Sequence, residues 1–371
     1  MPTVAVAAEK RSSWIGSPLF DLCFFFGSGA LGLAVGGVML AAPSTVLPLW
    51  FLWLWLVEGP HLFATWQRTY LDTGFRQQHG GLLIGSLAWL LPGPVLWGVS
   101  KASGHSEPFL LYLGAAALWS FHHTVRQYHG LLSIYQRLGQ AEAVERRWDT
   151  RLLHGVLWGA FGCFQLAHPA SRTLWGLPAE PSGLEQGLVH MLTALLGSAL
   201  LGWLGLVWRR WRLGQALKPG LFALAVAVGT TLFAFFVIGL REPLFSQPLN
   251  VEQVFMAATA IAGLVHGLHY LGIVIATSRR RATAPGATPQ TVDWLNRAPL
   301  RAYLVMVVAS LSYLGLTLLR GSPLGLSPES DTAQLFLALY WGLFLHHFWL
   351  DQKIWRPSTD ARLRHELGLD A

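Results

Sequence analysis

The segment LLYLGAAALWSFHHTVRQYHG, residues 110–130, joins an apolar run to a polar end that contains three histidines. Residues 110–121 are almost all apolar or small, and His122, His123 and His129 follow within a few positions, together with Arg126. With its flanks, the apolar run approaches the roughly 20 residues that an α-helix needs to cross the hydrocarbon layer of a bilayer. The segment therefore predicts a transmembrane helix that ends in a histidine cluster.

The composition of the whole chain indicates the same environment. Of the 371 residues, 53% are hydrophobic and 12% are charged, and the mean hydropathy is +0.43. Soluble domains usually contain about 25% charged residues. Eighteen tryptophans and 39 glycines are typical of polytopic membrane proteins, where aromatic residues line the interfaces and small residues let helices pack closely. The predicted fold class is an all-α integral membrane bundle that forms one domain over residues 1–371.

Apolar segments recur along the chain and predict ten transmembrane helices. They cover residues 18–41, 47–66, 82–100, 109–130, 152–169, 188–208, 220–240, 252–277, 300–319 and 333–351. With a cytoplasmic N-terminus, 21 of the 26 lysines and arginines fall on cytoplasmic segments and four on the opposite side, while Arg126 lies at a helix end. This distribution obeys the positive-inside rule. We therefore expect both termini in the cytoplasm and the protein in the inner (plasma) membrane, with cytoplasmic tails at 1–13 and 352–371 and a cytoplasmic loop at 278–299.

The net charge of +7 and the pI near 9.7 do not indicate a nucleic-acid partner. The basic residues flank apolar runs, and no surface of interleaved basic and aromatic residues is apparent, so membrane topology explains them better. Cys23 and Cys163 lie inside apolar segments, and no disulfide framework is expected. The expected partners are membrane lipids and a lipophilic small molecule, whereas the oligomeric state is left open.

Four predicted helices carry histidine clusters. The clusters are His61 with Glu58, then His122, His123 and His129, then His266 and His269, and finally His346 and His347 with Asp351. All four helices run toward the cytoplasm in the predicted topology, so the clusters are expected at one membrane depth near the cytoplasmic face. Spacings of three or four residues place side chains on one face of a helix, as in His122 and Arg126 or His266 and His269. The expected presence of four such clusters at one membrane depth favours a shared site over isolated interfacial histidines.

Imidazole nitrogens with a few carboxylates suit iron, copper or zinc. The predicted metal ligands are His61, His122, His129, His266, His269, His346 and His347, with His123 and Asp351 either on the metal or orienting a ligand. The candidates for catalytic roles are Glu58, Arg126, Tyr128 and Asp351. We expect Arg126 to meet Glu58, Asp72, Asp351 or an anionic substrate group. The clusters contain no cysteine, which argues against an iron–sulfur centre.

The segments GPHLFATWQRTYLD, SFHHTVRQYHG, LVHGLHYLG and LHHFWLDQKIWRP resemble the scattered histidine elements of the Brp/Blh membrane proteins. The nearest local match is the last one, in which His346 precedes Asp351 by five residues and IWRP follows. That family cleaves β-carotene to retinal with dioxygen and iron bound by histidines, so the resemblance implies an iron-dependent membrane dioxygenase. Membrane desaturases and hydroxylases are similar in concept, but their H-x3-H and H-x2-HH boxes are not reproduced here.

The sequence thus predicts a membrane oxygenase or other oxidoreductase that acts on a lipophilic substrate with dioxygen. The expected cofactor is a histidine-bound transition metal, with non-haem Fe(II) as the first candidate. Three alternatives remain open. A proton- or metal-coupled transporter would use the histidines as a relay and would need a polar path across the membrane. A haem-binding membrane protein would use histidines of facing helices as axial ligands. A non-catalytic membrane scaffold would need neither.

Overall fold

The computed structural model describes residues 13–214, 218–240, 249–283, 297–319 and 330–370. Within these ranges the regular structure is helical. The N-terminal half contains α1 (Pro18–Asp21), η1 (Leu22–Phe26), α2 (Gly27–Ala41), η2 (Pro43–Thr45), α3 (Val46–Trp53), η3 (Leu54–Glu58), α4 (Gly59–Arg68), α5 (Thr73–Ser86), η4 (Leu87–Leu90), α6 (Pro92–Ser103), α7 (Glu107–Leu138) and α8 (Ala143–Ala167). The remainder contains α9 (Pro169–Leu174), α10 (Gly183–Arg212), α11 (Pro219–Leu232), η5 (Phe233–Gly239), α12 (Val251–Thr283), α14 (Pro299–Leu319), α15 (Asp331–Ile354) and α16 (Ala361–Glu366).

Six helical stretches of the described chain are long and apolar enough to cross a membrane: Pro18–Ala41, Pro43–Arg68, Thr73–Ser103, Gly183–Arg212, Pro219–Gly239 and Val251–Thr283. The chain is therefore an α-helical bundle of the membrane type. The other predicted spans fall on α7, α8, α14 and α15. Of these, α7 and α15 carry the histidine clusters, which lower their hydropathy, so ten crossings remain a prediction.

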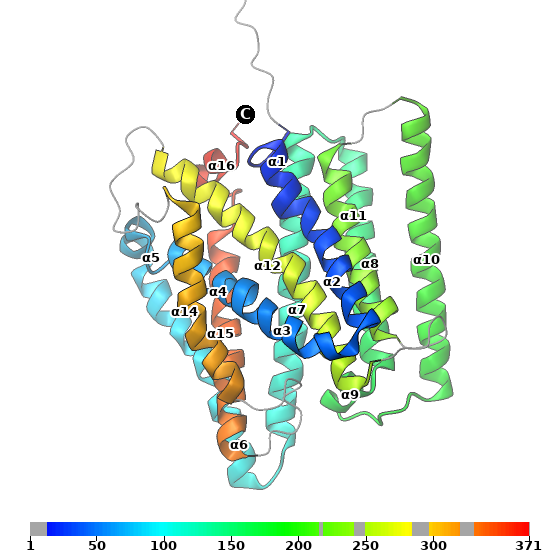
Figure 1. Ribbon diagram of the computed structural model, residues 1–371, viewed down its shortest axis with the longest axis vertical. Coiled ribbons are helices and arrows are strands. Elements are labelled where there is room, and N and C mark those ends of the chain that lie inside the picture. The colour runs from blue at the N-terminus through cyan, green and yellow to red at the C-terminus, as the bar shows by residue number, and fades with distance from the viewer. Residues whose placement is uncertain (1–12, 215–217, 241–248, 284–296, 320–329, 371) are drawn as a thin grey trace, which may run out of the picture.

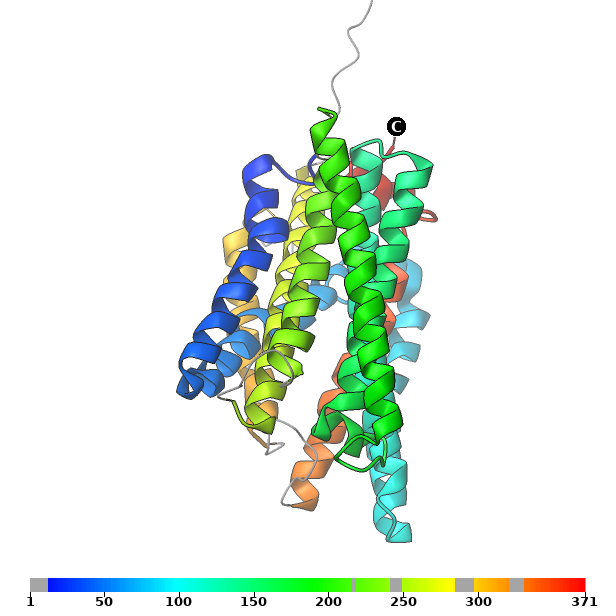
Figure 2. The same cartoon turned by 90° about the vertical axis from the view of Figure 1, so that its right-hand side faces the viewer.

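Most of the long helices run side by side along the long axis of the molecule, whereas α3 and α4 cross the bundle obliquely (Figure 1). α10 lies at the outer edge of the bundle (Figure 1) and at the front in the turned view (Figure 2), and it packs on α8. α1 and α16 lie at the same end of the bundle (Figure 1). Arg280 joins these two parts, because its guanidinium donates to the backbone carbonyls of Ile15 and Glu366. The two described ends of the chain thus share one side, and which side faces the cytoplasm remains a prediction.

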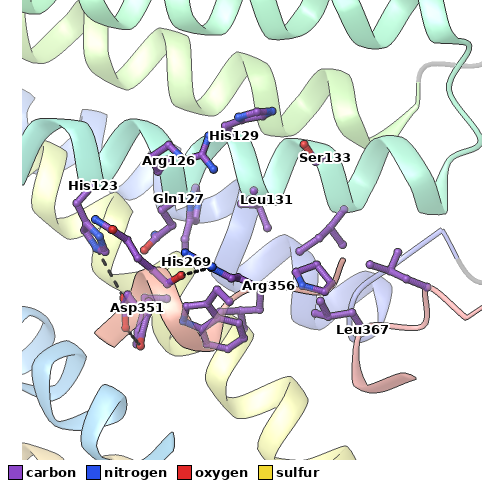
Figure 3. A pocket seen from close by; sticks show the side chains of 18 of the residues that line it. His123, Arg126, Gln127, His129, Leu131, Ser133, His269, Asp351, Arg356 and Leu367 are labelled. Carbon is purple, nitrogen blue, oxygen red and sulfur yellow. Dashed lines mark hydrogen bonds and ion pairs between the residues drawn. The ribbon is translucent and has the colours of Figure 1, made fainter. Parts of the chain in front are cut away.

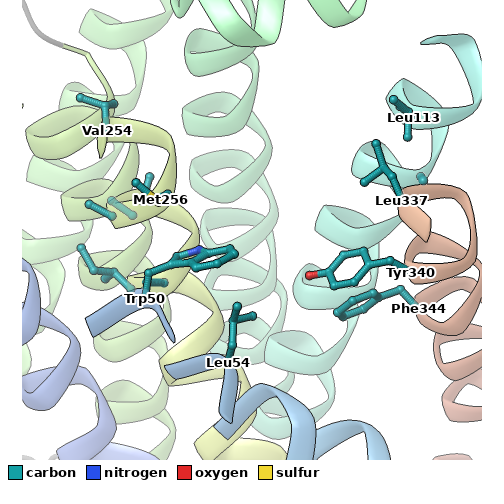
Figure 4. Packing of buried hydrophobic residues seen from close by; sticks show 14 of the residues in the cluster. Trp50, Leu54, Leu113, Val254, Met256, Leu337, Tyr340 and Phe344 are labelled. Atoms are coloured by element: carbon teal, nitrogen blue, oxygen red, sulfur yellow. The ribbon is translucent and has the colours of Figure 1, made fainter. Parts of the chain in front are cut away.

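The largest apolar core lies among α3, α7, α12 and α15 (Figure 4). Trp50 and Leu54 approach it from one side, and Tyr340 and Phe344 from the other. The close approach of the crossing helix to α12 requires a residue without a side chain at Gly267, where a Cβ atom would lie 2.6 Å from Val57 Cγ1. Small residues at helix contacts are the usual means of close packing in membranes.

Several boundaries differ from those expected. α7 continues to Leu138 and α12 to Thr283, because a helix can extend beyond the apolar stretch that reveals it in sequence. His123 consequently lies close to the middle of its helix instead of near its end. The expected C-terminal tail 352–371 includes α16, which packs against α12. Residues 1–12 of the expected N-terminal tail and 284–296 of the expected loop lie outside the described residues.

Candidate metal centre

The crossing helix changes its hydrogen-bond pattern just before His61. η3 is a π-helical stretch in which the Gly59 N–H donates to the Leu54 carbonyl five residues back. Pro60 has no N–H, so the Leu56 carbonyl would lose its intrahelical partner, and the Tyr303 hydroxyl of α14 donates to it at 2.8 Å instead. Single π-helical turns within α-helices often occur at functional sites. Here the irregular turn directs Glu58 and His61 into the bundle, where both are buried.

His61, His123, His347 and Asp351 form a group that could hold one metal ion. They come from α4, α7 and α15, and one potential ligand atom of each lies within 4.8 Å of all the others. Their relative exposures are 1%, 6%, 1% and 5%. Asp351 Oδ2 lies 3.7 Å from His123 Nε2 and 3.5 Å from His347 Nε2. Two ligands on opposite sides of one ion stand about 4.2 Å apart at the usual bond length of about 2.1 Å, so a small contraction suffices.

Thr65 and Tyr270 hold the two α15 side chains in place. The hydroxyl of Thr65 donates to Asp351 Oδ1 at 2.9 Å, and that of Tyr270 donates to the same oxygen at 2.7 Å. His347 Nδ1 lies 2.7 Å from Thr65 Oγ1. Since the Thr65 proton is directed at Asp351, His347 donates through Nδ1 and its Nε2 keeps a free lone pair. Such outer hydrogen bonds set the tautomer and direction of metal ligands.

The chemistry of the group fits a cation better than a closed polar network. The buried atoms His123 Nε2, His347 Nε2, Asp351 Oδ2 and both ring nitrogens of His61 have no hydrogen-bond partner among the described residues. Buried polar atoms normally have partners, because leaving one unsatisfied costs on the order of 1–3 kcal/mol. Three imidazoles and one carboxylate thus bring atoms without hydrogen-bond partners close together. Such a group is a donor set for a transition metal.

Two further predicted residues border the group. The ring of His266 from α12 lies with its centroid 4.7 Å from that of His61 and 5.1 Å from that of His123, and its Nδ1 has no partner among the described residues. Glu58 Oε2 lies 3.7 Å from His61 Nδ1. Glu58 is thus placed to orient His61, and His266 is placed as an additional nitrogen donor.

Other candidates are directed elsewhere. His269 donates through Nε2 to the Phe25 carbonyl at 2.8 Å, and His346 Nε2 lies 3.0 Å from the Tyr70 hydroxyl. His122 is exposed, and His129 Nδ1 lies 3.4 Å from His154 Nε2 on α8. Tyr128 is buried within an apolar cluster. Asp72, considered as a partner of Arg126, instead pairs with Arg281 and caps α5 by accepting from Phe75 N.

Two cavities meet at the metal group, and His123 is the lining residue they have in common. One, of about 220 Å³, is bordered mainly by aromatic and aliphatic side chains such as Trp50, Phe344 and Phe348, and also reaches Glu58 and His266. Part of its wall is visible in Figure 4. The other, of about 380 Å³, extends along α7 from His123 and Asp351 toward Leu367 (Figure 3). Arg126 lines this second cavity.

Thr65 was missed in the sequence analysis. It lies four residues after His61 and therefore on the same face of α4, which is the signal that identifies it. Tyr270, which donates to Asp351 Oδ1, also lies outside the predicted set of ligands and catalytic residues. Its position directly after His269 does not reveal that it, and not the histidine, faces Asp351.

Comparisons with protein families, with curated proteins and with solved structures each find no match for this chain.

Proposed function

We propose that this protein is a membrane-embedded metalloenzyme that acts with dioxygen on a lipophilic substrate. His61, His123, His347 and Asp351 would bind the ion, with His266 as a further donor. Iron(II) is the proposed metal, because histidines with one carboxylate and open positions are typical of non-haem iron oxygenases. Bound iron would supply the activation of dioxygen that a hydrocarbon substrate requires.

The observation that carries this proposal is the meeting of a buried histidine–aspartate group with an apolar cavity at His123. In the proposed reaction the aromatic walls hold the hydrocarbon against the ion and exclude water. Thr65 and Tyr270 keep Asp351 and His347 directed at the ion through the hydrogen bonds described above. The resemblance to the Brp/Blh proteins belongs to this proposal, as does a location in the inner membrane.

A transporter is the weaker alternative. A histidine relay needs polar groups on both sides of the cluster. The second cavity supplies them on one side, but the aromatic and aliphatic walls of the first cavity begin on the other side of His123. This arrangement favours a reaction chamber over a proton or metal path.

Metal content tests the proposal directly. We expect the purified protein, reconstituted with Fe(II), to retain about one transition-metal ion per chain by mass spectrometry, with the affinity depending on deprotonated ligands. His347→Gln and Asp351→Asn should abolish retention. His190→Ala is the matched control, since His190 is exposed on α10. Metal-dependent consumption of dioxygen with a membrane lipid extract, including added β-carotene, tests the reaction. Equal metal retention in the variants and the wild type would refute the site.

A further inference from the structure

The second cavity is lined by a polar stripe along one face of α7. His122, Arg126, His129, Ser133 and Arg137 all line it, at intervals of four, three, four and four residues. Such intervals place side chains on one face of a helix. The stripe begins beside His123 at the metal group and continues to the end of α7. Figure 3 shows Arg126, His129 and Ser133 along this helix and Asp351 at the inner end.

Three arginines of this cavity are exposed and have no counter-ion among the described residues. Arg126 and Arg137 on α7 and Arg356 after α15 line it, and none of the three forms an ion pair within the described parts of the chain. By contrast, the buried Arg68 and the partly buried Arg281 are both paired with Glu366. The only carboxylate in the cavity lining is Asp351, whose Oδ1 is already occupied by Thr65 and Tyr270.

Arg126 is the most informative of the three. It is exposed near the middle of the 32-residue helix α7. On the predicted topology, in which α7 crosses the membrane, an ionisable residue at this position marks a functional site with a partner. It follows His123 by three residues, which is about 4.5 Å along the helix axis. An anion bound by Arg126 would therefore lie within a few atoms of the metal group.

The lining of the same cavity also includes apolar side chains, Leu131 and Ile134 of α7, Ile273 of α12 and Trp355 after α15. The cavity thus combines cationic and apolar surfaces, and at His123 it meets the cavity whose walls are mainly aromatic. A small inorganic anion would leave these apolar surfaces uncovered, and a neutral hydrocarbon would leave the guanidinium groups without a partner.

We infer that the ligand of this site is an amphipathic anion, with a carboxylate or phosphate head held by Arg126 and Arg356 and a hydrocarbon chain that passes His123 into the aromatic cavity. The inference rests on the proposed function only in treating this ligand as the substrate. It narrows the substrate class, because a carotenoid carries no anionic group, and it places the reacting carbon atoms close to the head.

Binding to the full-length protein in neutral phosphatidylcholine nanodiscs tests the inference without turnover. The probes are spin-labelled stearate, its methyl ester and a long-chain alkyl phosphate. We expect the carboxylate and the phosphate to immobilise on the protein and the ester to bind at least about tenfold more weakly, which is the effect of losing one charge-assisted hydrogen bond. Inorganic phosphate alone should compete poorly, because it lacks the chain.

Three variants locate the head. Arg126→Gln and Arg356→Gln should each weaken stearate binding about tenfold, and Arg126→Lys should retain part of it. The control is Arg147→Gln, because Arg147 is exposed on α8 and lies outside both cavities. Equal binding of stearate and ester, or equal binding in R126Q and R147Q, would overturn the inference.

The same assay on chelator-treated protein separates the two proposals. If anion-selective binding persists while the protein fails to retain metal after reconstitution, the proposed function fails and the anion site stands. If metal is retained normally but stearate has no advantage over its ester, the anion site fails and the proposed metal centre stands.

Discussion

Thr65 positions two of the four residues of the metal group. Its one hydroxyl contacts both Asp351 Oδ1 and His347 Nδ1, so it links the only two candidate ligands that come from the same helix. With this proton directed at Asp351, the imidazole of His347 is fixed in the tautomer whose Nε2 can bind a metal. A buried side chain that never touches the ion can therefore control two of its ligands.

Thr65→Val keeps the shape of the side chain but removes the hydroxyl. We expect the affinity for the metal to fall about 10- to 100-fold, the usual effect of losing an outer hydrogen bond of a ligand. Competition with a chelator of known affinity measures this change. Thr69→Val is the control, because the Thr69 hydroxyl bonds only the Thr65 carbonyl of its own helix. Equal losses in both variants would contradict the role of Thr65.

The histidines of α7 show what sequence can and cannot supply at this scale. The sequence allowed the prediction that histidines of four helices gather at one depth. It did not reveal which of His122 and His123 faces inward, because neighbours on a helix differ by about 100° in direction and both follow the same apolar run. The i, i+7 pattern of His122 and His129 identified a real helix face, but in the structure this face lines the polar cavity, and His123 meets the metal group.

At the scale of elements, the position of His61 depends on how closely α4 and η3 approach α12. Gly267 allows this approach, since a Cβ atom there would stand 2.6 Å from Val57 Cγ1 and 3.9 Å from His61 Cβ. The sequence revealed the glycine-rich composition but not this pairing, because α3 and α4 cross the bundle obliquely and no periodicity within one helix encodes the crossing.

Gly267→Ala should therefore force α4 and α12 apart. We expect a loss of about 1–3 kcal/mol in the free energy of unfolding, as for other overpacked contacts, and weaker metal binding because His61 and His266 move with their helices. Thermal unfolding in detergent and metal titration measure the two effects. Gly37→Ala in α2 is the matched control, since a Cβ atom there meets nothing within 4 Å. Unchanged metal affinity in G267A would show that this contact does not position His61.

At the scale of the molecule, a largely buried charge network lies at the end of the bundle where the two described ends of the chain are found. Glu366 of α16 pairs with Arg68 of α4 and Arg281 of α12, and Arg281 also pairs with Asp72. The sequence placed these arginines in flanking segments as topology signals. It could not show that the side chain of Glu366 pairs with them, because Arg68 and Arg281 lie almost 300 and 85 residues away from Glu366 along the chain.

Glu366→Ala would leave two buried guanidinium groups without this partner. We expect a loss of about 3–5 kcal/mol, the usual cost of breaking a buried ion pair from one side, seen as a lower unfolding temperature and easier proteolysis of the C-terminal segment. Asp370→Asn is the control, because Asp370 is partly exposed beside Arg364 and His365, and exposed pairs contribute at most about 1 kcal/mol. Equal stability of the two variants would show that the ion pairs of Glu366 do not stabilise the protein.

Among the described residues, His123 is the one shared by the linings of the second cavity and the aromatic cavity, and this has a consequence for variants at this position. Replacing its ring by a smaller side chain would remove a proposed metal ligand and would also join the two cavities, so that water could pass from one into the other. His347 lines neither of these two cavities, so His347→Ala would remove a proposed ligand without joining them. Hydration of the aromatic cavity, followed with a polarity-sensitive fluorescent probe, should therefore distinguish the two variants even when both fail to retain metal.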